Sequence, residues 1–346
     1  MGRNVRFLTV AALLAGCGAR SSLDEANAGA DASSGADVAD VADVVNDAAS
    51  PPVLCPTGPA PAPVLVAHIG AQPLSFVGPH TASELLGTLR AKLDDGLPAY
   101  RVVALSKCGA VRDIASASMS SPMLSIVLRG DALFVSDGYA GVYEVPVSGG
   151  TLTLRTVEAG ALAVDDTDIY VAAPDHVSRT PRAGGPTVVI AGFGADTIAV
   201  DDAFVYLEKA YGVLRLAKSD PSQIATLAAP NYSAGYWWSS IWLAVSPTQV
   251  FFPSGSTTYP NLPVCAVPKG GGDVTCTQPA EAPTRLVWDG ALYFTAYPGI
   301  DKIADIDAGA TQLASVTSHD APFTLWVDDT SVWWLTLSGD LYRVDK

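Results

Sequence analysis

The sequence predicts an all-β fold, a β-propeller built of four-stranded blades, and three observations support this prediction. A segment that combines an apolar strand, a polar turn and an aromatic-rich strand recurs six times, about 40 residues apart. A second polar turn follows most of these segments about twenty residues later, and stretches of period-two hydrophobicity lie between the turns. The composition agrees, because 31 glycines and 25 prolines supply many turns while charged residues make up only 16% of the chain.

Each repeat therefore forms two tight hairpins. Four of the six first turns contain Asp-Asp or Asp-Gly pairs, which suit turns because short polar side chains hydrogen-bond their own backbone. We favour this role over Ca²⁺ binding, which needs a denser alternation of oxygen ligands. The first hairpins are Leu128–Phe134, Val164–Tyr170, Val200–Tyr206, Val245–Phe251, Trp288–Tyr293 and Val327–Trp333. The second turns fall at Gly149–Gly150, Gly184–Gly185, Ser219–Asp220, Gly270–Gly272 and Asp307–Gly309.

The number of blades depends on the two ends of the repeat region. The C-terminal segment Asp340–Lys346 matches the third strand of a blade, and Pro63–His68 can supply the missing fourth strand and close the ring. A degenerate unit fits between residues 74 and 114, with strands at Leu74–Val77, Tyr100–Leu105 and Val111–Ile114. Within it, Thr81–Lys92 has helical spacing and is interpreted as an insertion. Counting this unit gives seven blades, which we favour, and omitting it gives six.

Residues 1–16 are predicted to be a lipoprotein signal peptide. Two arginines precede the apolar run Phe7–Ala15, which is too short to span a bilayer. The run ends in Leu14–Cys17, which resembles a bacterial lipobox and so implies cleavage before Cys17 and lipidation of that cysteine. An ordinary secretory signal is the alternative. Gly18 after the cysteine favours the outer membrane over the inner membrane.

Residues 17–62 are predicted to be the lipidated Cys17 followed by a disordered tether. Between residues 20 and 52 the chain repeats Ala, Asp, Ser and Val, with seven acidic residues, one arginine and no aromatic residue. Such a segment buries too little apolar surface to offset the entropy of ordering, and its charges repel one another. The propeller domain is then residues 63–346.

The other four cysteines are predicted to form two disulfides, as an exported protein allows. In a hairpin centred on Gly270–Gly271, Cys265 and Cys276 lie opposite each other, at a separation that a disulfide can bridge. Cys55 and Cys108 remain, and their pairing ties the start of the domain to the degenerate unit. A zinc site is disfavoured because no Cys-x-x-Cys motif occurs and the chain has only four histidines.

Charge and motifs exclude several function classes. The formal net charge of −15 leaves no surplus of Lys and Arg to form a nucleic-acid interface. Catalytic and nucleotide-binding fingerprints are absent from the sequence, so no catalytic residue, metal or cofactor is predicted. Asp175–His176 is one of two adjacent acid–His pairs, and such neighbours within a strand point to opposite faces.

Aromatic residues are the strongest candidates for ligand contacts. In a propeller blade, the connection into the first strand and the connection from the second to the third strand emerge on the same face. Aromatic rings on that rim suit a sugar, a peptide or a protein partner. By contrast, Trp288, Trp326, Trp333 and Trp334 occupy strand positions and are predicted to lie in the core. The candidate ligand-binding residues are Tyr236, Trp237, Trp238, Tyr259, Tyr211, Tyr297 and His176.

The repeat of Val-Asp-Asp-x-x-Val-Tyr/Trp followed by Gly-Gly, behind a lipobox and an acidic spacer, resembles the propeller lipoproteins of myxobacteria and related soil bacteria. The segment Ser338–Val344 is distantly similar to the quinoprotein-type and NHL-type propeller repeats. The resemblance covers about Pro63 to Lys346 and implies a β-propeller at the cell envelope. It implies no particular activity, because most members of this group have none assigned.

We therefore expect a monomeric, non-enzymatic protein that is anchored to the outer membrane by lipid and binds a carbohydrate, a peptide or an envelope protein. One alternative is an extracellular lyase or hydrolase that works in the propeller channel, which acids and His176 converging on that channel would favour. The other alternative is a scaffold for envelope assembly.

Overall fold

The computed structural model describes residues 58–69, 80–92, 98–117, 125–138, 140–209, 212–229, 243–253, 262–277, 283–296, 298–315 and 322–346. The chain divides into two units, Met1–Ser50 and Pro51–Lys346, and every described residue belongs to the second unit. The signal peptide and most of the tether therefore lie outside the described residues. In the described part of the chain, no helix is long and apolar enough to cross a membrane.

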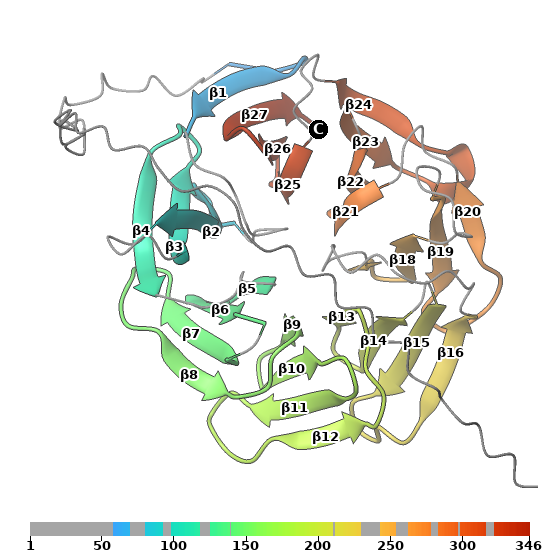
Figure 1. The fold of residues 1–346 in the computed structure, drawn as a ribbon. Coiled ribbons are helices and arrows are strands. Elements are labelled where there is room, and N and C mark those ends of the chain that lie inside the picture. Colours follow the sequence, from blue (N-terminus) through green and yellow to red (C-terminus); the bar gives the residue numbers. More distant parts are fainter. Residues whose placement is uncertain are drawn as a thin grey trace, which may run out of the picture. The chain divides into compact units, whose positions relative to one another are not determined.

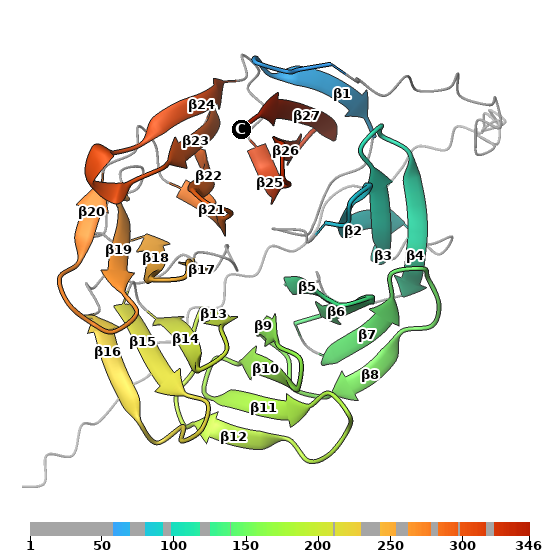
Figure 2. The ribbon, with the colours of Figure 1, turned by 180° about the vertical axis from the view of Figure 1, so that it is seen from behind.

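Seven antiparallel sheets form a ring, so the second unit is a seven-bladed, all-β propeller (Figures 1 and 2). Blade 1 has three described strands, β2 (Glu84–Lys92), β3 (Pro98–Ser106) and β4 (Val111–Ala117). Blade 2 has β5 (Ser125–Arg129), β6 (Ala132–Ser136), β7 (Val142–Pro146) and β8 (Thr153–Thr156). Blade 3 has β9 (Ala161–Val164), β10 (Asp168–Ala172), β11 (Val177–Pro181) and β12 (Val188–Ala191).

The ring continues with three further blades and the closing blade. Blade 4 has β13 (Thr197–Val200), β14 (Phe204–Lys209), β15 (Gly212–Ala217) and β16 (Ile224–Ala228). Blade 5 has β17 (Ala244–Val245), β18 (Gln249–Pro253), β19 (Val264–Pro268) and β20 (Thr275–Thr277). Blade 6 has β21 (Pro283–Trp288), β22 (Leu292–Ala296), β23 (Gly299–Ile303) and β24 (Thr311–Ser315), with a 3₁₀ turn, η1 (Ile306–Ala308), before β24. Blade 7 has β25 (Pro322–Val327), β26 (Ser331–Thr336) and β27 (Asp340–Asp345).

The N-terminal strand of the domain completes blade 7 and closes the ring, as predicted. Strand β1 (Val64–His68) pairs antiparallel with β27, with Val64 opposite Arg343 and His68 opposite Asp340. The backbone N–H of Ala60 donates to the carboxylate of Asp345 at 2.7 Å. The last strand of the chain therefore has a partner on both sides, which covers the edge that β27 would otherwise expose.

The apolar core is divided among the interfaces between blades. Seven clusters of buried side chains are found among the described residues, and each contains residues from two neighbouring blades. The inner strands consequently bury both faces; all five residues of β6 and all six of β26 are buried. Three of the four tryptophans predicted to be core are at most 3% exposed, and the fourth, Trp288, is half-buried and stacks on Phe251 at 5.2 Å.

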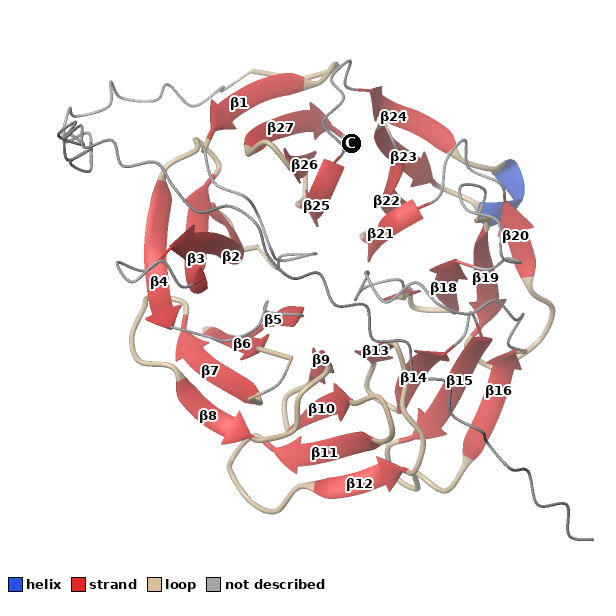
Figure 3. Cartoon of the chain, in the orientation of Figure 1, coloured by secondary structure: helices blue, strands red, loops and turns tan. Residues whose placement is uncertain are grey.

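One predicted element is wrong. The segment Thr81–Lys92 was expected to be a helical insertion, but Glu84–Lys92 is strand β2, which pairs with β3 along its whole length (Figure 3). Leu85, Leu86 and Leu89 are all buried, because β2 lies between blades 7 and 2 and packs on both sides. A strand that is buried on both faces shows no alternation, so the sequence pattern did not distinguish it from a helix. The predicted strand Leu74–Val77 lies outside the described residues.

The blades have two different ends. We call the end with the turns between strands one and two and between strands three and four the turn face, and the opposite end the loop face. On the turn face, the predicted role of the aspartates is confirmed. Asp165 Oδ1 accepts the backbone N–H groups of Thr167 and Asp168 at 2.8 and 2.7 Å, and Asp201 and Asp328 cap their own turns in the same way.

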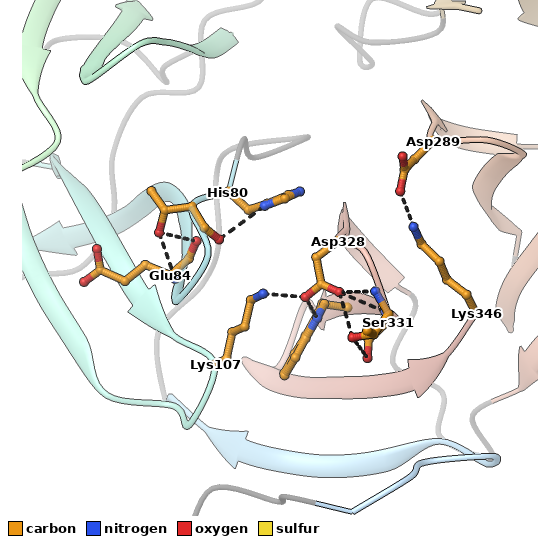
Figure 4. A network of polar contacts seen from close by, with 10 residues as sticks. His80, Glu84, Lys107, Asp289, Asp328, Ser331 and Lys346 are labelled. Carbon is orange, nitrogen blue, oxygen red and sulfur yellow. Dashed lines mark hydrogen bonds and ion pairs between the residues drawn. The ribbon is translucent and has the colours of Figure 1, made fainter.

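The same aspartates also join neighbouring blades through an arrangement we call the interblade clamp. The second carboxylate oxygen of Asp201 accepts the Tyr206 hydroxyl at 2.8 Å and the Lys269 ammonium at 2.7 Å, and Lys269 comes from the next blade. Two equivalent clamps occur. Asp165, Tyr170 and Lys218 join blades 3 and 4. Asp328, Trp333 and Lys107 join blades 7 and 1, as Figure 4 shows.

Reduced versions of the clamp occur at other interfaces. Lys346 forms an ion pair with Asp289 and lies 5.8 Å from the centre of the Tyr293 ring. Arg182 of blade 3 lies 5.0 Å from the ring of Phe134 in blade 2, which has no carboxylate at the equivalent position. A cation above an aromatic ring is attracted by the ring's quadrupole, so the contact between Arg182 and Phe134 joins blades 2 and 3 without an aspartate.

Cys265 and Cys276 lie opposite each other in the β19–β20 hairpin and are joined by a disulfide with a Cα–Cα distance of 4.0 Å. This is the register that the hairpin geometry predicts. Cys108 is also disulfide-bonded, but Cys55 lies outside the described residues, so the Cys55–Cys108 pairing stays a prediction.

Candidate functional site

Buried polar side chains gather where the innermost hairpins reach the loop face. Strand one of a blade begins there and strand two ends there, so the paired residues at this end lie side by side. Ser125 faces Ser136, Thr197 faces Glu208, and Arg285 faces Thr295. All six side chains are at most 5% exposed. We call these residues, together with Asp137 and Thr336, the polar collar; the last two are also buried.

The collar contains charges of both signs. Asp137 is 1% exposed and its carboxylate accepts the backbone N–H of Gly141 at 3.1 Å, which fixes the connection from β6 to β7. Arg285 donates from Nε to the carbonyl oxygen of Phe323 at 3.4 Å. Burial lowers the pKa of the Arg285 guanidinium well below its usual value. Burying ionisable groups is costly, so the collar is an unusual set of buried polar side chains within an apolar ring.

His176 is the one predicted ligand-binding residue that the structure describes. It precedes β11 on the loop face, where its Nδ1 lies 2.7 Å from Asp175 Oδ1 and its Nε2 lies 2.9 Å from Glu158 Oε2. Glu158 comes from the connection between blades 2 and 3. The expectation that Asp175 and His176 point apart is wrong, because both residues lie in a connection and not within a strand.

The two carboxylates favour the protonated form of His176. The hydrogen bond with Asp175 raises the pKa of the imidazole, and the bond with Glu158 adds to this effect against the opposing effect of burial. Both ring nitrogens are thereby engaged, so neither is available to take a proton from a substrate in this arrangement. The geometry suits a positively charged contact that ties two loop-face connections together.

The six aromatic candidates, Tyr236, Trp237, Trp238, Tyr259, Tyr211 and Tyr297, lie outside the described residues. The strands on either side of them along the chain are described. Tyr236, Trp237 and Trp238 fall between β16 and β17, and the other three fall between the second and third strands of their blades. Cys17 also lies outside the described residues.

Sequence reasoning missed the polar collar. Its signal is a single polar residue at the end of an apolar strand, as in Phe204–Leu207 followed by Glu208. That pattern is common at strand ends, and only the closed ring shows that these positions are buried together. No group of three or more His, Cys, Asp or Glu side chains that could hold a metal ion is found in the part of the chain that the structure describes.

Comparison with known proteins supports the fold. No family model matches the chain, and no curated protein matches its sequence. A catalytically inactive variant of virginiamycin B lyase from Staphylococcus aureus, solved with quinupristin, matches with a TM-score of 0.59 and 11% identity, over 82% of this chain and 98% of that chain. BamB from Moraxella catarrhalis matches with a TM-score of 0.52 and 13% identity, over 82% of this chain and 100% of that chain.

A chain of a mitotic checkpoint complex matches with a TM-score of 0.57 and 13% identity, over 83% of this chain and 92% of that chain. At such low identities the similarity establishes the β-propeller fold alone. The solved structures include an enzyme with a ligand and a component of a protein complex, so this fold serves both catalysis and binding.

Proposed function

We propose that this protein is a lipid-anchored envelope protein whose propeller binds a carbohydrate, peptide or protein partner through its loop face, without catalysing a reaction. The observation that carries the proposal is the difference between the two faces. On the turn face, the interblade clamps tie the turns of blades 3, 4 and 7 to the neighbouring blades. The loop face carries His176 with its two carboxylate partners, and we assign the six candidate aromatic residues to this face from their positions between the strands in the sequence.

This division suits a binding protein. Clamped turns on one face hold the blades together, while the connections on the other face differ in length from blade to blade, as is common for loops that bind ligands. Aromatic side chains in such connections bury apolar area and keep a polar tip in water, which is the composition of binding hot spots. The presence of a propeller chain in a mitotic checkpoint complex supports a protein partner as one form of this role.

Binding is tested with the propeller from residue 18 onward, immobilised and exposed to envelope extract and to a glycan array. We expect Trp237→Ala together with Trp238→Ala to remove a partner that the unchanged chain retains. The control is Asp166→Ala on the turn face, whose side chain is 81% exposed, and this variant is expected to keep the partner. Retention of the same partners by all three chains would reject the loop face as the binding surface.

Lipid anchoring at Cys17 is a separate part of the proposal and rests on the resemblance of Leu14–Cys17 to a lipobox. Cells that express the chain are labelled with a radioactive fatty acid, and the protein is separated by detergent phase partitioning. We expect label and detergent-phase recovery for the unchanged chain and neither for Cys17→Ser. Equal labelling of both chains would contradict anchoring at this residue.

A lyase or hydrolase is the alternative, since a lyase has the same fold. The described residues favour it less, because His176 is held by two carboxylates and lies at the start of a third strand, away from the innermost strands.

A further inference from the structure

The interface between blades 5 and 6 lacks an interblade clamp. The strand registers place Ser246 at the position of the clamp aspartate and Asp305 at the position of the clamp lysine. Ser246 Oγ accepts the backbone N–H of Gln249, in its own turn, at 2.8 Å. The Asp305 carboxylate accepts the backbone N–H of Asp307, in its own blade, at 3.1 Å. The strands of blade 5 contain no charged residue, so they supply no ion pair to hold blade 6.

A carboxyl group is buried in this interface. Asp301 on β23 is only 4% exposed. It lies directly opposite Phe294 on β22, and residues opposite each other in antiparallel strands share a face. Phe294 packs in the cluster that blade 6 shares with Phe251 and Ala266 of blade 5, so the Asp301 side chain faces blade 5. No hydrogen bond or ion pair to this carboxyl occurs among the described residues.

The strands that surround Asp301 on the side of blade 5 offer no cation. Strand β24 lies beside β23 and contains no charged side chain, as do β17, β18, β19 and β20 of the facing blade. The two cysteines of blade 5 are joined in the disulfide and do not titrate. In the turn after β19, Lys269 is paired with Asp201 of blade 4, and Asp273 is exposed.

The ionisable side chains of β21, β22 and β23 other than Asp301 face blade 7. Arg285 donates to the carbonyl oxygen of Phe323 in that blade. Tyr293 packs in the cluster between blades 6 and 7, and Lys302 lies 5.5 Å from the centre of its ring. The two aspartates near η1, Asp305 and Asp307, are exposed. Burial without a compensating cation therefore raises the pKa of the Asp301 carboxyl above its usual value.

We propose that the interface between blades 5 and 6 is a pH-sensitive joint of the ring, held most firmly when Asp301 is neutral and loosened when its carboxylate is charged. A neutral carboxyl costs less to bury than a carboxylate, and separation of the two blades returns the charged group to water. The joint responds to pH in the opposite sense to the clamps, which need their aspartates charged. It does not depend on the proposed function.

The sign of the effect follows from the raised pKa. The neutral form of Asp301 stabilises the closed interface below the pKa of an exposed aspartate, about 4, and this contribution is lost as the pH rises through the higher value of the closed form. Local opening between blades 5 and 6 should therefore be more frequent at pH 8 than at pH 5, while the clamp aspartates, with lowered pKa values, stay charged at both.

Hydrogen exchange of the full chain, followed by mass spectrometry, measures this opening. Each exchange rate is divided by the intrinsic rate at its own pH, so that only the opening equilibrium remains. We expect β23 to open about two- to fivefold more at pH 8 than at pH 5. Strand β15, which lies in the clamped blade 4, should open equally at both values and serves as the comparison within the same molecule.

Asp301→Asn keeps the shape of the side chain but removes its charge, so β23 should open equally at the two pH values in this variant. Asp307→Asn is the matched control in the same blade, since Asp307 is exposed, and it should keep the difference. The unchanged chain tests the proposal even if the first variant does not fold. The proposal is overturned if β23 of the unchanged chain shows no difference, if β15 shows the same difference, or if Asp301→Asn retains it.

Discussion

At the scale of single residues, the aspartates of the turn face both cap their own turns and bind lysines of neighbouring blades. Partial burial raises the pKa of the Asp201 carboxyl, but the hydrogen bonds from Lys269, Tyr206 and the turn backbone outweigh this effect and lower the pKa below its usual value. The Asp165 and Asp328 carboxyls are shifted in the same direction for the same reasons. The charged form of each aspartate is therefore the form that the fold requires.

Removing one of these charges is expected to destabilise the fold. Asp201→Asn keeps the shape of the side chain but leaves the Lys269 ammonium without its counter-charge, so the free energy of unfolding should fall by about 1–3 kcal/mol. Asp202→Asn is the matched control in the same turn, since Asp202 is exposed, and it should change stability by less than about 0.5 kcal/mol. Urea unfolding followed by tryptophan fluorescence measures both, and equal effects would argue against the clamp.

The lowered pKa values also predict how stability depends on acid. A carboxyl with a lowered pKa in the folded state stabilises the fold above the pKa of the unfolded chain, about 4, and loses that contribution as the pH falls. The free energy of unfolding, measured in urea between neutral pH and about pH 3, should therefore decline as the pH falls to about 4 and below. The decline should be smaller in Asp201→Asn. An identical decline in that variant would mean that other carboxyls control the acid sensitivity.

The contacts of His176 with Asp175 and Glu158 on the loop face should show the opposite dependence on pH. Its pKa is raised in the folded state, so its bonds with Asp175 and Glu158 contribute fully below the unfolded value of about 6.5 and are lost as the pH rises through the folded value. An NMR titration should show the imidazole of His176 titrating above 6.5, and Glu158→Gln should lower that pKa. A titration at or below about 6.5 in the unchanged chain would contradict the geometry.

At the scale of elements, the repeat predicted most hairpins because each one is local in sequence. The turn aspartates and the Cys265–Cys276 register follow from residues a few positions apart. The lysines of the clamps could not be predicted, since Lys269 is 68 residues from Asp201 and reaches it only through the packing of blades. Strand β2 was misassigned for a related reason, because its burial on both faces comes from two neighbouring blades.

The β19–β20 hairpin offers a test at this scale. Its disulfide joins residues separated by 11 positions, and loop-closure entropy gives a stabilisation of about 2–3 kcal/mol for such a short loop. Replacing both Cys265 and Cys276 by Ala should lower the free energy of unfolding by about that amount, while the variant keeps the native β-sheet signal in circular dichroism. No measurable loss would show that hairpin pairing alone fixes these strands.

At the scale of the whole molecule, stability depends on a ring with one core per interface. Each cluster of buried residues needs both of its blades, so an opened ring would expose apolar surface at its two ends. The sequence predicted closure because Asp340–Lys346 matches a third strand and Pro63–His68 can supply the fourth, and it favoured seven blades because a degenerate unit fits between residues 74 and 114. The polar collar could not be predicted, since its residues come from different blades that only the closed ring brings together.

Ring closure by β1 is tested by truncation. A chain that begins at Ile69 lacks the outer strand of blade 7 and the contact between Ala60 and Asp345, so we expect it to unfold at a much lower temperature or to aggregate. A chain that begins at Cys55 keeps both features and should unfold like the full chain. Equal thermal stability of the two truncated chains would mean that β1 does not hold the ring closed.

The central claim is that partners bind the loop face, and photo-crosslinking in cells tests it most directly. A photoreactive phenylalanine replaces Asp175 on the loop face or Asp166 on the turn face, whose side chains are 86% and 81% exposed. Comparable exposure makes the two sites a matched pair. We predict a discrete crosslinked product from position 175 and none from position 166. A product from position 166 alone, or the same product from both positions, would contradict the account.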